Sequence, residues 1–168
     1  MLGLTALRAR LADDPGAVIE TVAREAGVTP REALEALPEA MRQFAGGEFF
    51  VKVMEDIARW GDVTTIVHTE DGIFEFTGPM PSGKEGRGYY NLGARSGLHG
   101  HLRPERCHGI AFVERPFMGR PSAFVAFLNP EGGIMFKVFV GRTAKGDLRP
   151  EQLNAFRALA ETVVPVTA

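Results

Sequence analysis

The sequence of 168 residues has one cysteine, Cys107, one tryptophan and two tyrosines. A single cysteine excludes an internal disulfide and any metal site built from several cysteines. An excess of basic residues is also missing, since 19 Lys and Arg stand against 21 Asp and Glu. Proteins that bind nucleic-acid backbones usually carry such an excess, so we expect no nucleic-acid partner.

Long apolar runs are absent from the sequence as well. No stretch approaches the ~18 apolar residues that a membrane-spanning helix needs. The N-terminus contains Arg8, Arg10, Asp13 and Asp14 and lacks the apolar centre of a secretory signal. We therefore expect a cytoplasmic protein without membrane insertion. The length and the apolar content of 45% predict one domain, residues 1–168.

The first third of the chain has helical periodicity. Apolar residues recur at helical spacing between Pro15 and Ala26, and again from Phe49 to Trp60. Between them, Thr29 and Glu32 form a capping-box signature at the start of a further helix. Residues 1–61 are thus predicted to be helical.

From Val63 onward the apolar period changes to two, which is typical of strands. The predicted strands are Val63–Thr69, Ile73–Thr77, Arg87–Leu92, Leu98–Leu102, Cys107–Glu114, Ser122–Leu128 and Ile134–Val140. Hairpin-type connections such as Asp71-Gly72 indicate antiparallel neighbours. The sequence predicts an α+β fold in which a large antiparallel sheet, residues 62–142, is flanked by the N-terminal helices and a C-terminal helix, residues 149–164.

One predicted hairpin separates polar from apolar side chains. Symmetric folding about the connection 93–97 places Tyr89 opposite His101 and Asn91 opposite His99, all on one face. The other face is core material and comprises Tyr90, Leu92, Leu98 and Leu102. A slip of one residue would exchange the faces of a strand.

The polar face of this hairpin allows three interpretations. Histidine and tyrosine are both axial ligands to haem iron. His99 and His101 on one strand are equally suited to zinc or another divalent metal. The face can also be a polar surface on which Tyr89 and His101 stack as a cross-strand pair.

Other features of the sequence give weaker indications. His68 is a lone strand histidine, and from its pattern alone we interpret it as structural. The segment Arg115–Arg120 is predicted to be a turn-rich loop that shields a ligand or caps the sheet. Residues 17–37 are similar to a helix-turn-helix, without a basic recognition helix. Basic residues that could neutralise carboxylates of an anionic ligand flank the hairpin: Lys84, Arg87, Arg95 and Arg103.

Several segments, in order, resemble the cytosolic haem-utilisation carriers of the HutX/HuvX/ChuX type. These segments are Trp60–Thr69, Arg87–Leu92, Gly100–Leu102, Arg115–Gly119 and Phe136–Arg142. The likeness extends from about Val18 to Phe156. It implies one half of the duplicated HemS/ChuS-like architecture, and a homodimer.

The resemblance also implies a function. The chain would bind ferric haem b non-covalently and deliver it to a cytosolic haem-degrading enzyme in iron acquisition, without being an enzyme itself. By this resemblance Tyr89 is the expected axial ligand, with His101 or His68 as second ligand or support. The hairpin itself adds His99, from its polar face, and Arg87, from its basic flank, to the predicted haem-binding set. The alternatives are a haem-degrading enzyme and, less favoured, a helix-turn-helix regulator that binds DNA.

Overall fold

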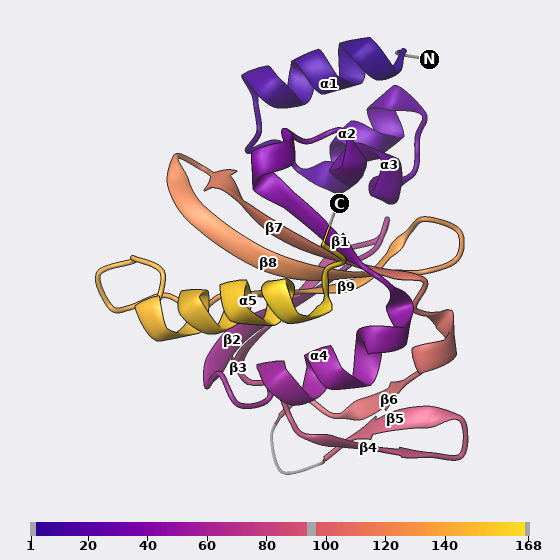
Figure 1. The fold of residues 1–168 in the computed structure, drawn as a ribbon, viewed down its shortest axis with the longest axis vertical. Coiled ribbons are helices and arrows are strands. Elements are labelled where there is room, and N and C mark those ends of the chain that lie inside the picture. Colours follow the sequence, from indigo (N-terminus) through magenta and orange to yellow (C-terminus); the bar gives the residue numbers. More distant parts are fainter. Residues whose placement is uncertain (1–2, 94–96, 167–168) are drawn as a thin grey trace.

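A computed structural model of the chain describes residues 3–93 and 97–166. Its N-terminal part consists of helices α1 (Leu4–Asp13), α2 (Ile19–Ala26) and α3 (Pro30–Glu35), strand β1 (Arg42–Ala45) and helix α4 (Phe50–Ile57), with 3₁₀ turns at Glu39–Met41 and Gly47–Phe49 (Figure 1). Strands follow at β2 (Asp62–His68), β3 (Ile73–Pro79), β4 (Gly83–Gly86), β5 (Tyr89–Leu92), β6 (Gly100–Leu102), β7 (Gly109–Phe117), β8 (Arg120–Leu128) and β9 (Ile134–Phe139), with a 3₁₀ turn at Pro104–Arg106 before β7. Helix α5 (Pro150–Val163) completes the described fold.

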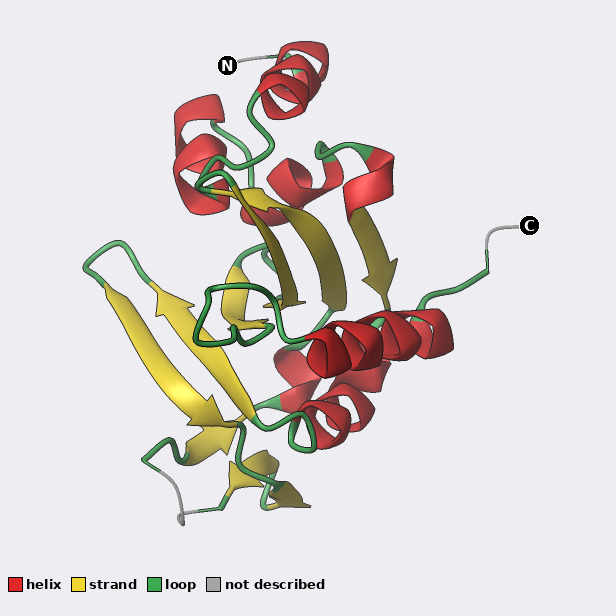
Figure 2. Cartoon of the chain, turned by 90° about the vertical axis from the view of Figure 1, so that its left-hand side faces the viewer, coloured by secondary structure: helices red, strands yellow, loops and turns green. Residues whose placement is uncertain are grey.

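The strands form two antiparallel sheets. The larger has the order β1-β7-β8-β9-β2-β3, and the smaller has the order β4-β5-β6. Figure 2 shows the smaller sheet at the end of the long β2–β3 hairpin, on the side away from the N-terminal helices. The predicted α+β architecture, with a large antiparallel sheet between N-terminal helices and a C-terminal helix, is confirmed.

Helices cover both faces of the central strands, because alternate residues of a strand point to opposite sides. On β7, Ile110 and Phe112 pack in one buried cluster with α4 and α5. Their neighbours Ala111 and Val113 pack in a second cluster with α1, α2 and α3. Since both faces are buried, β7 and β8 are apolar over most of their length rather than alternating with polar residues.

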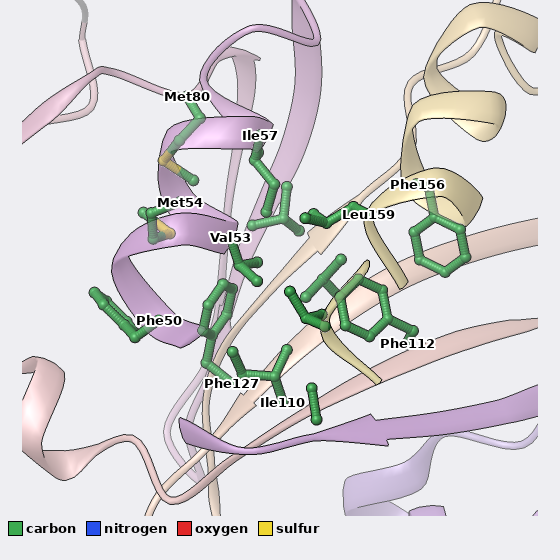
Figure 3. Close-up of a cluster of buried hydrophobic side chains, with 14 of the residues drawn as sticks. Phe50, Val53, Met54, Ile57, Met80, Ile110, Phe112, Phe127, Phe156 and Leu159 are labelled. Atoms are coloured by element: carbon green, nitrogen blue, oxygen red, sulfur yellow. The ribbon is translucent and has the colours of Figure 1, made fainter. Parts of the chain in front are cut away.

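The cluster under α4 and α5 is rich in aromatic rings. Figure 3 shows Phe50 and Ile57 of α4 and Phe156 of α5 directed toward the sheet, where they meet Phe112 and Phe127. The rings of Phe50 and Phe127 pack edge-on, with centroids 5.3 Å apart. Burial of each phenyl group stabilises the fold by about 2–3 kcal/mol, so this layer anchors the sheet.

The N-terminal region differs in part from its prediction. The capping box at Thr29 is present, with the Glu32 amide donating to the Thr29 hydroxyl at 3.2 Å. However, residues 42–45 are not helical: they form β1, which pairs with β7. This strand has four residues and a mixed pattern, Arg-Gln-Phe-Ala, too short for a period of two to be visible. No helix among residues 3–93 and 97–166 is long and apolar enough to span a membrane.

Candidate functional site

The smaller sheet brings Tyr89, Asn91 and His101 together on one face. Asn91 lies directly opposite His101 in the β5–β6 pairing. The rings of Tyr89 and His101 pack edge-on with centroids 5.7 Å apart. The shared face predicted for these three side chains is therefore present.

Asn91 sets the hydrogen-bonding state of His101. Its Nδ2 donates to the carbonyls of Lys84 and Gly86, each at 3.1 Å. Its Oδ1 is thus an acceptor, and it lies 2.6 Å from His101 Nδ1. Nδ1 must then carry the proton, which leaves the lone pair on Nε2. Metal-binding histidines are commonly fixed in this way by an acceptor on the other nitrogen.

Arg103 completes the cluster around Tyr89. Its Nη2 donates to the Tyr89 hydroxyl at 3.2 Å, and its guanidinium lies 5.4 Å from the centre of the ring. A cation in this position stabilises a phenolate, which is the form of tyrosine that binds ferric iron. We define Tyr89, Asn91, His101 and Arg103 as the tyrosine patch.

The predicted register of this hairpin is wrong by two residues. Asn91 was predicted opposite His99 and is opposite His101. Because side chains alternate with a period of two, the shift leaves the faces of β5 and β6 unchanged. It does remove Leu98 and His99 from the strand, since β6 begins at Gly100, and exposed His99 does not join the patch. Residues 94–96 of the connection, with Arg95, lie outside the described residues.

Tyr90 and Arg87 lie apart from the tyrosine patch. Tyr90 is buried, its hydroxyl accepts from the Gly83 amide at 3.2 Å, and burial raises the pKa of its phenol. It is a core residue, as its alternation predicts. Arg87 is exposed in the β4–β5 turn. The guanidinium that contacts Tyr89 comes from Arg103 instead, and a haem contact from Arg87 stays a prediction.

His68 lies in a different place, at a cavity of about 440 Å³ beside α2. The floor is the part of the large sheet that contains β9, β2 and β3, where Ile66 pairs with Lys137 on one side and Glu75 on the other. Apolar side chains form much of the wall: Val18, Ile19, Ile66, Ile73, Phe117, Phe139, Val140 and Leu148. The cavity can thus take an apolar molecule rather than a simple ion. We call it the His68 cavity.

Buried charges line the same cavity. Lys137 Nζ is 2.5 Å from Glu20 Oε1, and His68 Nδ1 is 3.5 Å from Glu20 Oε2. Burial acts to raise the pKa of Glu20, but Lys137 and His68 overcome it, so the pKa lies below the usual carboxyl value. Nδ1 of His68 faces the Glu20 carboxylate. In metal-binding histidines a carboxylate at one ring nitrogen commonly leaves the other, here Nε2, to bind the metal.

Arg115 is the most deeply buried cation of the cavity. It is 6% exposed, and one guanidinium nitrogen donates to the carbonyls of Pro15 and Ala17, both at 2.7 Å. Burial lowers its pKa to about 10, so it stays charged at neutral pH. Among the described residues, Arg115 Nε and Glu20 Oε2 are buried without a hydrogen-bond partner. The segment Arg115–Phe117 belongs to β7 and is not the loop that its turn-rich composition predicts.

The structure therefore divides the predicted iron ligands into two groups. His68 is at the end of β2 next to the β2–β3 turn, whereas the smaller sheet follows the opposite end of the hairpin, beyond Pro79. A strand of this length spans about 20 Å, at ~3.3 Å per residue. His101 and Tyr89 are therefore neighbours in the tyrosine patch, whereas His68 lies at a separate place in the fold.

The donor set suits haem better than a bare metal ion. A zinc or similar site needs three or four protein ligands. No group of three His, Cys, Asp or Glu side chains in the described part of the chain could hold a metal. In haem the porphyrin nitrogens already bind the iron, so the protein needs to supply only axial ligands. Tyr89 and His101 in the tyrosine patch, and His68 in its separate cavity, each carry a donor atom of the kind that an axial position takes.

Comparison with known proteins now adds to this geometry. The model of the family described as haem utilisation ChuX/HutX matches residues 43–159. The chain belongs to this family. It is 40% identical over 152 residues to the intracellular haem transport protein HutX of Vibrio cholerae, covering 90% of this chain and 79% of HutX.

Solved structures agree with this family membership. A crystal structure from Erwinia carotovora is 43% identical, has a TM-score of 0.90 and covers 94% of this chain and 98% of that one. The haem-binding protein ChuX is 40% identical, with a TM-score of 0.85 and coverage of 93% and 97%. The fold also matches about half of PhuS from Pseudomonas aeruginosa, with a TM-score of 0.75 at 18% identity, over 98% of this chain and 47% of PhuS. The chain was predicted to have the fold of one half of a longer protein, and this match to about half of PhuS confirms that prediction for the fold.

Sequence reasoning missed the charged lining of the His68 cavity. Glu20 and Lys137 are 117 residues apart in the chain, and each looks unremarkable in its own segment. One signal was available, because Lys137 is a lone charge within the apolar strand Ile134–Val140. A buried lysine needs a carboxylate nearby, but the sequence does not say which one.

Proposed function

We propose that this chain binds ferric haem b non-covalently and carries it through the cytoplasm to a haem-degrading enzyme. Tyr89 is the main axial ligand, with His101 or His68 as second ligand or supporting group; within one chain, His101 is the one that lies beside Tyr89. The chain acts as a homodimer and is not itself an enzyme. The observation that carries this proposal is the tyrosine patch: an accessible phenol hydrogen-bonded to Arg103 and packed on a histidine with a fixed tautomer.

The chemistry of the patch suits a carrier. A phenolate is a hard anionic donor that prefers ferric over ferrous iron. Reduction of the iron, or an incoming histidine, weakens such a bond, so the cargo can be released. His101 is exposed on the same face as Tyr89, which leaves an approach for the ligand of an acceptor.

The relatives support transport as the role. HutX of Vibrio cholerae is named an intracellular haem transport protein, and ChuX is named a haem-binding protein. From these names we extend haem binding, transport and an intracellular location to this chain.

Delivery can be tested by following haem transfer. Direct transfer requires contact between the two proteins, so its rate should rise with the concentration of a cognate haem-degrading enzyme and then saturate. Stopped-flow absorbance measures this rate, with apo-myoglobin as the non-cognate acceptor. One fixed rate for every acceptor and concentration would mean passive dissociation and would refute delivery by contact.

The enzyme alternative requires a separate measurement. With a physiological reductant and catalase present, a haem-degrading enzyme would bleach the Soret band and accumulate a defined tetrapyrrole product. Catalase removes free peroxide, so bleaching that survives it does not come from peroxide in solution. We expect little or no product; formation over several turnovers would overturn the carrier assignment.

A further inference from the structure

His101 differs from the other histidines of the chain in its hydrogen bonding. Within residues 3–93 and 97–166 it is the one histidine with a side-chain hydrogen bond, in which its Nδ1 donates to Asn91 Oδ1 at 2.6 Å. His99 and His108 are also exposed and make no such bond in that part of the chain. Because water can serve both nitrogens of an exposed ring, the contact with Asn91 is what sets His101 apart.

Asn91 is itself held in one orientation. Its Nδ2 lies near the carbonyl oxygens of Lys84, Gly86 and Tyr89, at 3.1, 3.1 and 3.4 Å. If the amide were turned by half a rotation, Oδ1 would face these oxygens and no donor would remain for them. The orientation with Oδ1 toward His101 is therefore the one that satisfies the surroundings of the amide.

Strand β4 supplies most of this support. It lies at the edge of the smaller sheet and has the sequence Gly-Lys-Glu-Gly, without an apolar side chain. It adds little to the core, but two of its carbonyls, those of Lys84 and Gly86, fix Asn91. The hydrogen bonds thus cross all three strands, from β4 through Asn91 on β5 to His101 on β6. Ordering an exposed ring costs side-chain entropy and buries little area, so this support points to a use for the ring itself.

We propose that Asn91 is a positioning residue for haem, which acts through His101 by keeping the Nε2 of that ring unprotonated beside Tyr89. A neutral imidazole carries one proton, so a proton fixed on Nδ1 leaves the lone pair on Nε2. In metal sites an outer hydrogen-bond partner commonly fixes the tautomer and the ring orientation of a histidine in this way. The inference rests on the proposed function, and it adds how the histidine of the tyrosine patch is prepared to meet the iron.

The tautomer can be measured on the haem-free chain. Nitrogen–proton correlation NMR at about pH 8, above the ordinary histidine pKa of about 6.5, shows which ring nitrogen carries the proton. We expect His101 to be protonated on Nδ1 in the wild type. Asn91→Ala should shift it to the tautomer mixture of exposed His99 and His108, which are references within the same chain. A His101 tautomer that stays on Nδ1 in Asn91→Ala would overturn the proposal.

A double-mutant cycle tests whether the effect on haem passes through His101. Asn91→Ala should lower the affinity for ferric haem about 10- to 100-fold, the range for losing the outer partner of a metal-bound histidine. His101→Ala should lower the affinity at least as much, and adding Asn91→Ala to it should change nothing further. Competition with apo-myoglobin measures the affinities. A further loss in the double variant would mean that Asn91 acts without the histidine.

Tyr90→Phe is the matched control for the smaller sheet. The Tyr90 hydroxyl accepts from the Gly83 amide of β4, and its side chain lies on the opposite face from Asn91. The variant therefore loosens β4 without removing the partner of His101. We expect the wild-type tautomer of His101 and the wild-type haem affinity. An equal loss of affinity in Tyr90→Phe and Asn91→Ala would show that only the attachment of β4 matters.

The outcomes separate this inference from the proposed function. A wild type that forms no ferric haem complex would overturn the proposed function and, with it, the inference. If the wild type binds haem but Asn91→Ala keeps the tautomer, or lowers the affinity without His101, the positioning role alone is wrong. Should Asn91→Ala not fold, Asn91→Ser replaces it, because its hydroxyl can still donate to a β4 carbonyl but lies one bond farther from His101.

Discussion

At the scale of single residues, the two neighbouring tyrosines differ by their strand face. Tyr89 and Tyr90 are adjacent in β5, so one side chain meets His101 and the other packs on Phe50 with ring centroids 5.8 Å apart. A Cβ at Gly83 would come within 2.3 Å of the Tyr90 ring. The buried position of Tyr90 is thus held by a glycine on the next strand, which leaves Tyr89 as the accessible phenol.

Replacement of Tyr89 tests the choice between these phenols. Tyr89→Phe should remove the phenolate-to-iron charge-transfer bands of the ferric complex, because no oxygen remains to bind the iron. Tyr90→Phe should leave those bands in place and lower the free energy of unfolding by about 1 kcal/mol, since the hydrogen bond from the Gly83 amide is lost. Absorbance titration and urea unfolding measure the two effects. A larger spectral change in Tyr90→Phe would contradict the face assignment.

Arg103 is expected to tune the same ligand. Arg103→Leu removes the cation that donates to the Tyr89 oxygen, so the affinity for ferric haem should fall about 3- to 10-fold, the effect of losing one exposed hydrogen bond of about 1 kcal/mol. Competition with apo-myoglobin measures the affinity. Arg106→Leu is the control, because exposed Arg106 pairs with Glu131 away from the patch. Equal losses in both variants would indicate a general electrostatic effect on an anionic ligand.

At the scale of helices and strands, α2 is tied to β9 by one buried ion pair. Glu20 and Lys137 have side chains 16% and 10% exposed, so each charge depends on the other. Lys137→Met should lower the free energy of unfolding at pH 7 by about 3 kcal/mol, because buried Glu20 loses its closest cation. Adding Glu20→Gln should restore most of this loss. If the double variant is no more stable than the single one, the pair is not the link between these elements.

The same pair gives a pH dependence with a defined sign. The pKa of Glu20 is lowered in the folded chain from the ordinary value of 4.5. Its contribution to stability is therefore complete above pH 4.5 and is lost as the pH falls through the lower, folded pKa. We expect the stability of the wild type to approach that of a Glu20→Gln variant below that range, since a protonated glutamate and a glutamine are both neutral while Lys137 stays charged in each. Urea unfolding at a series of pH values measures the difference, and a constant difference would contradict the assignment.

The predictability of each element followed its length and pattern. The long strands β2, β7, β8 and β9 alternate or run apolar over enough residues to be recognised from sequence. Strand β4, Gly-Lys-Glu-Gly, has no apolar residue and becomes a strand only because β5 pairs with it. The register of β5 and β6 failed because alternation repeats every two residues and cannot distinguish a shift of two.

The candidate site was predictable only in its local part. Tyr89, Asn91 and His101 lie within 13 residues, so strand alternation alone brought them to one face. The pairing of Glu20 with Lys137 depends on how α2 packs against the sheet. The residues near either position in the sequence do not predict that packing. The separation of His68 from the patch has the same cause, since it depends on the direction in which the smaller sheet leaves the hairpin.

At the scale of the whole molecule, the chain supplies only one half of a longer fold. We expect a homodimer through the sheet region. Sedimentation at micromolar concentration should show a species of twice the 18.3 kDa chain mass. A monomer whose mass does not change with concentration would contradict this prediction.

The order of strands in the large sheet has a consequence for folding kinetics. The units β7-β8-β9 and β2-β3 are each joined by short turns, but β2 pairs with β9 through residues about seventy positions apart, such as Thr65 and Val138. Closing so long a loop costs chain entropy before any contact offsets it, so non-local pairing slows folding. We expect the β7-β8-β9 meander to form in the transition state and the β2-β3 hairpin to dock later. Val125→Ala in β8 should then slow refolding, whereas Val63→Ala in β2 should mainly accelerate unfolding, as measured by stopped-flow chevron analysis.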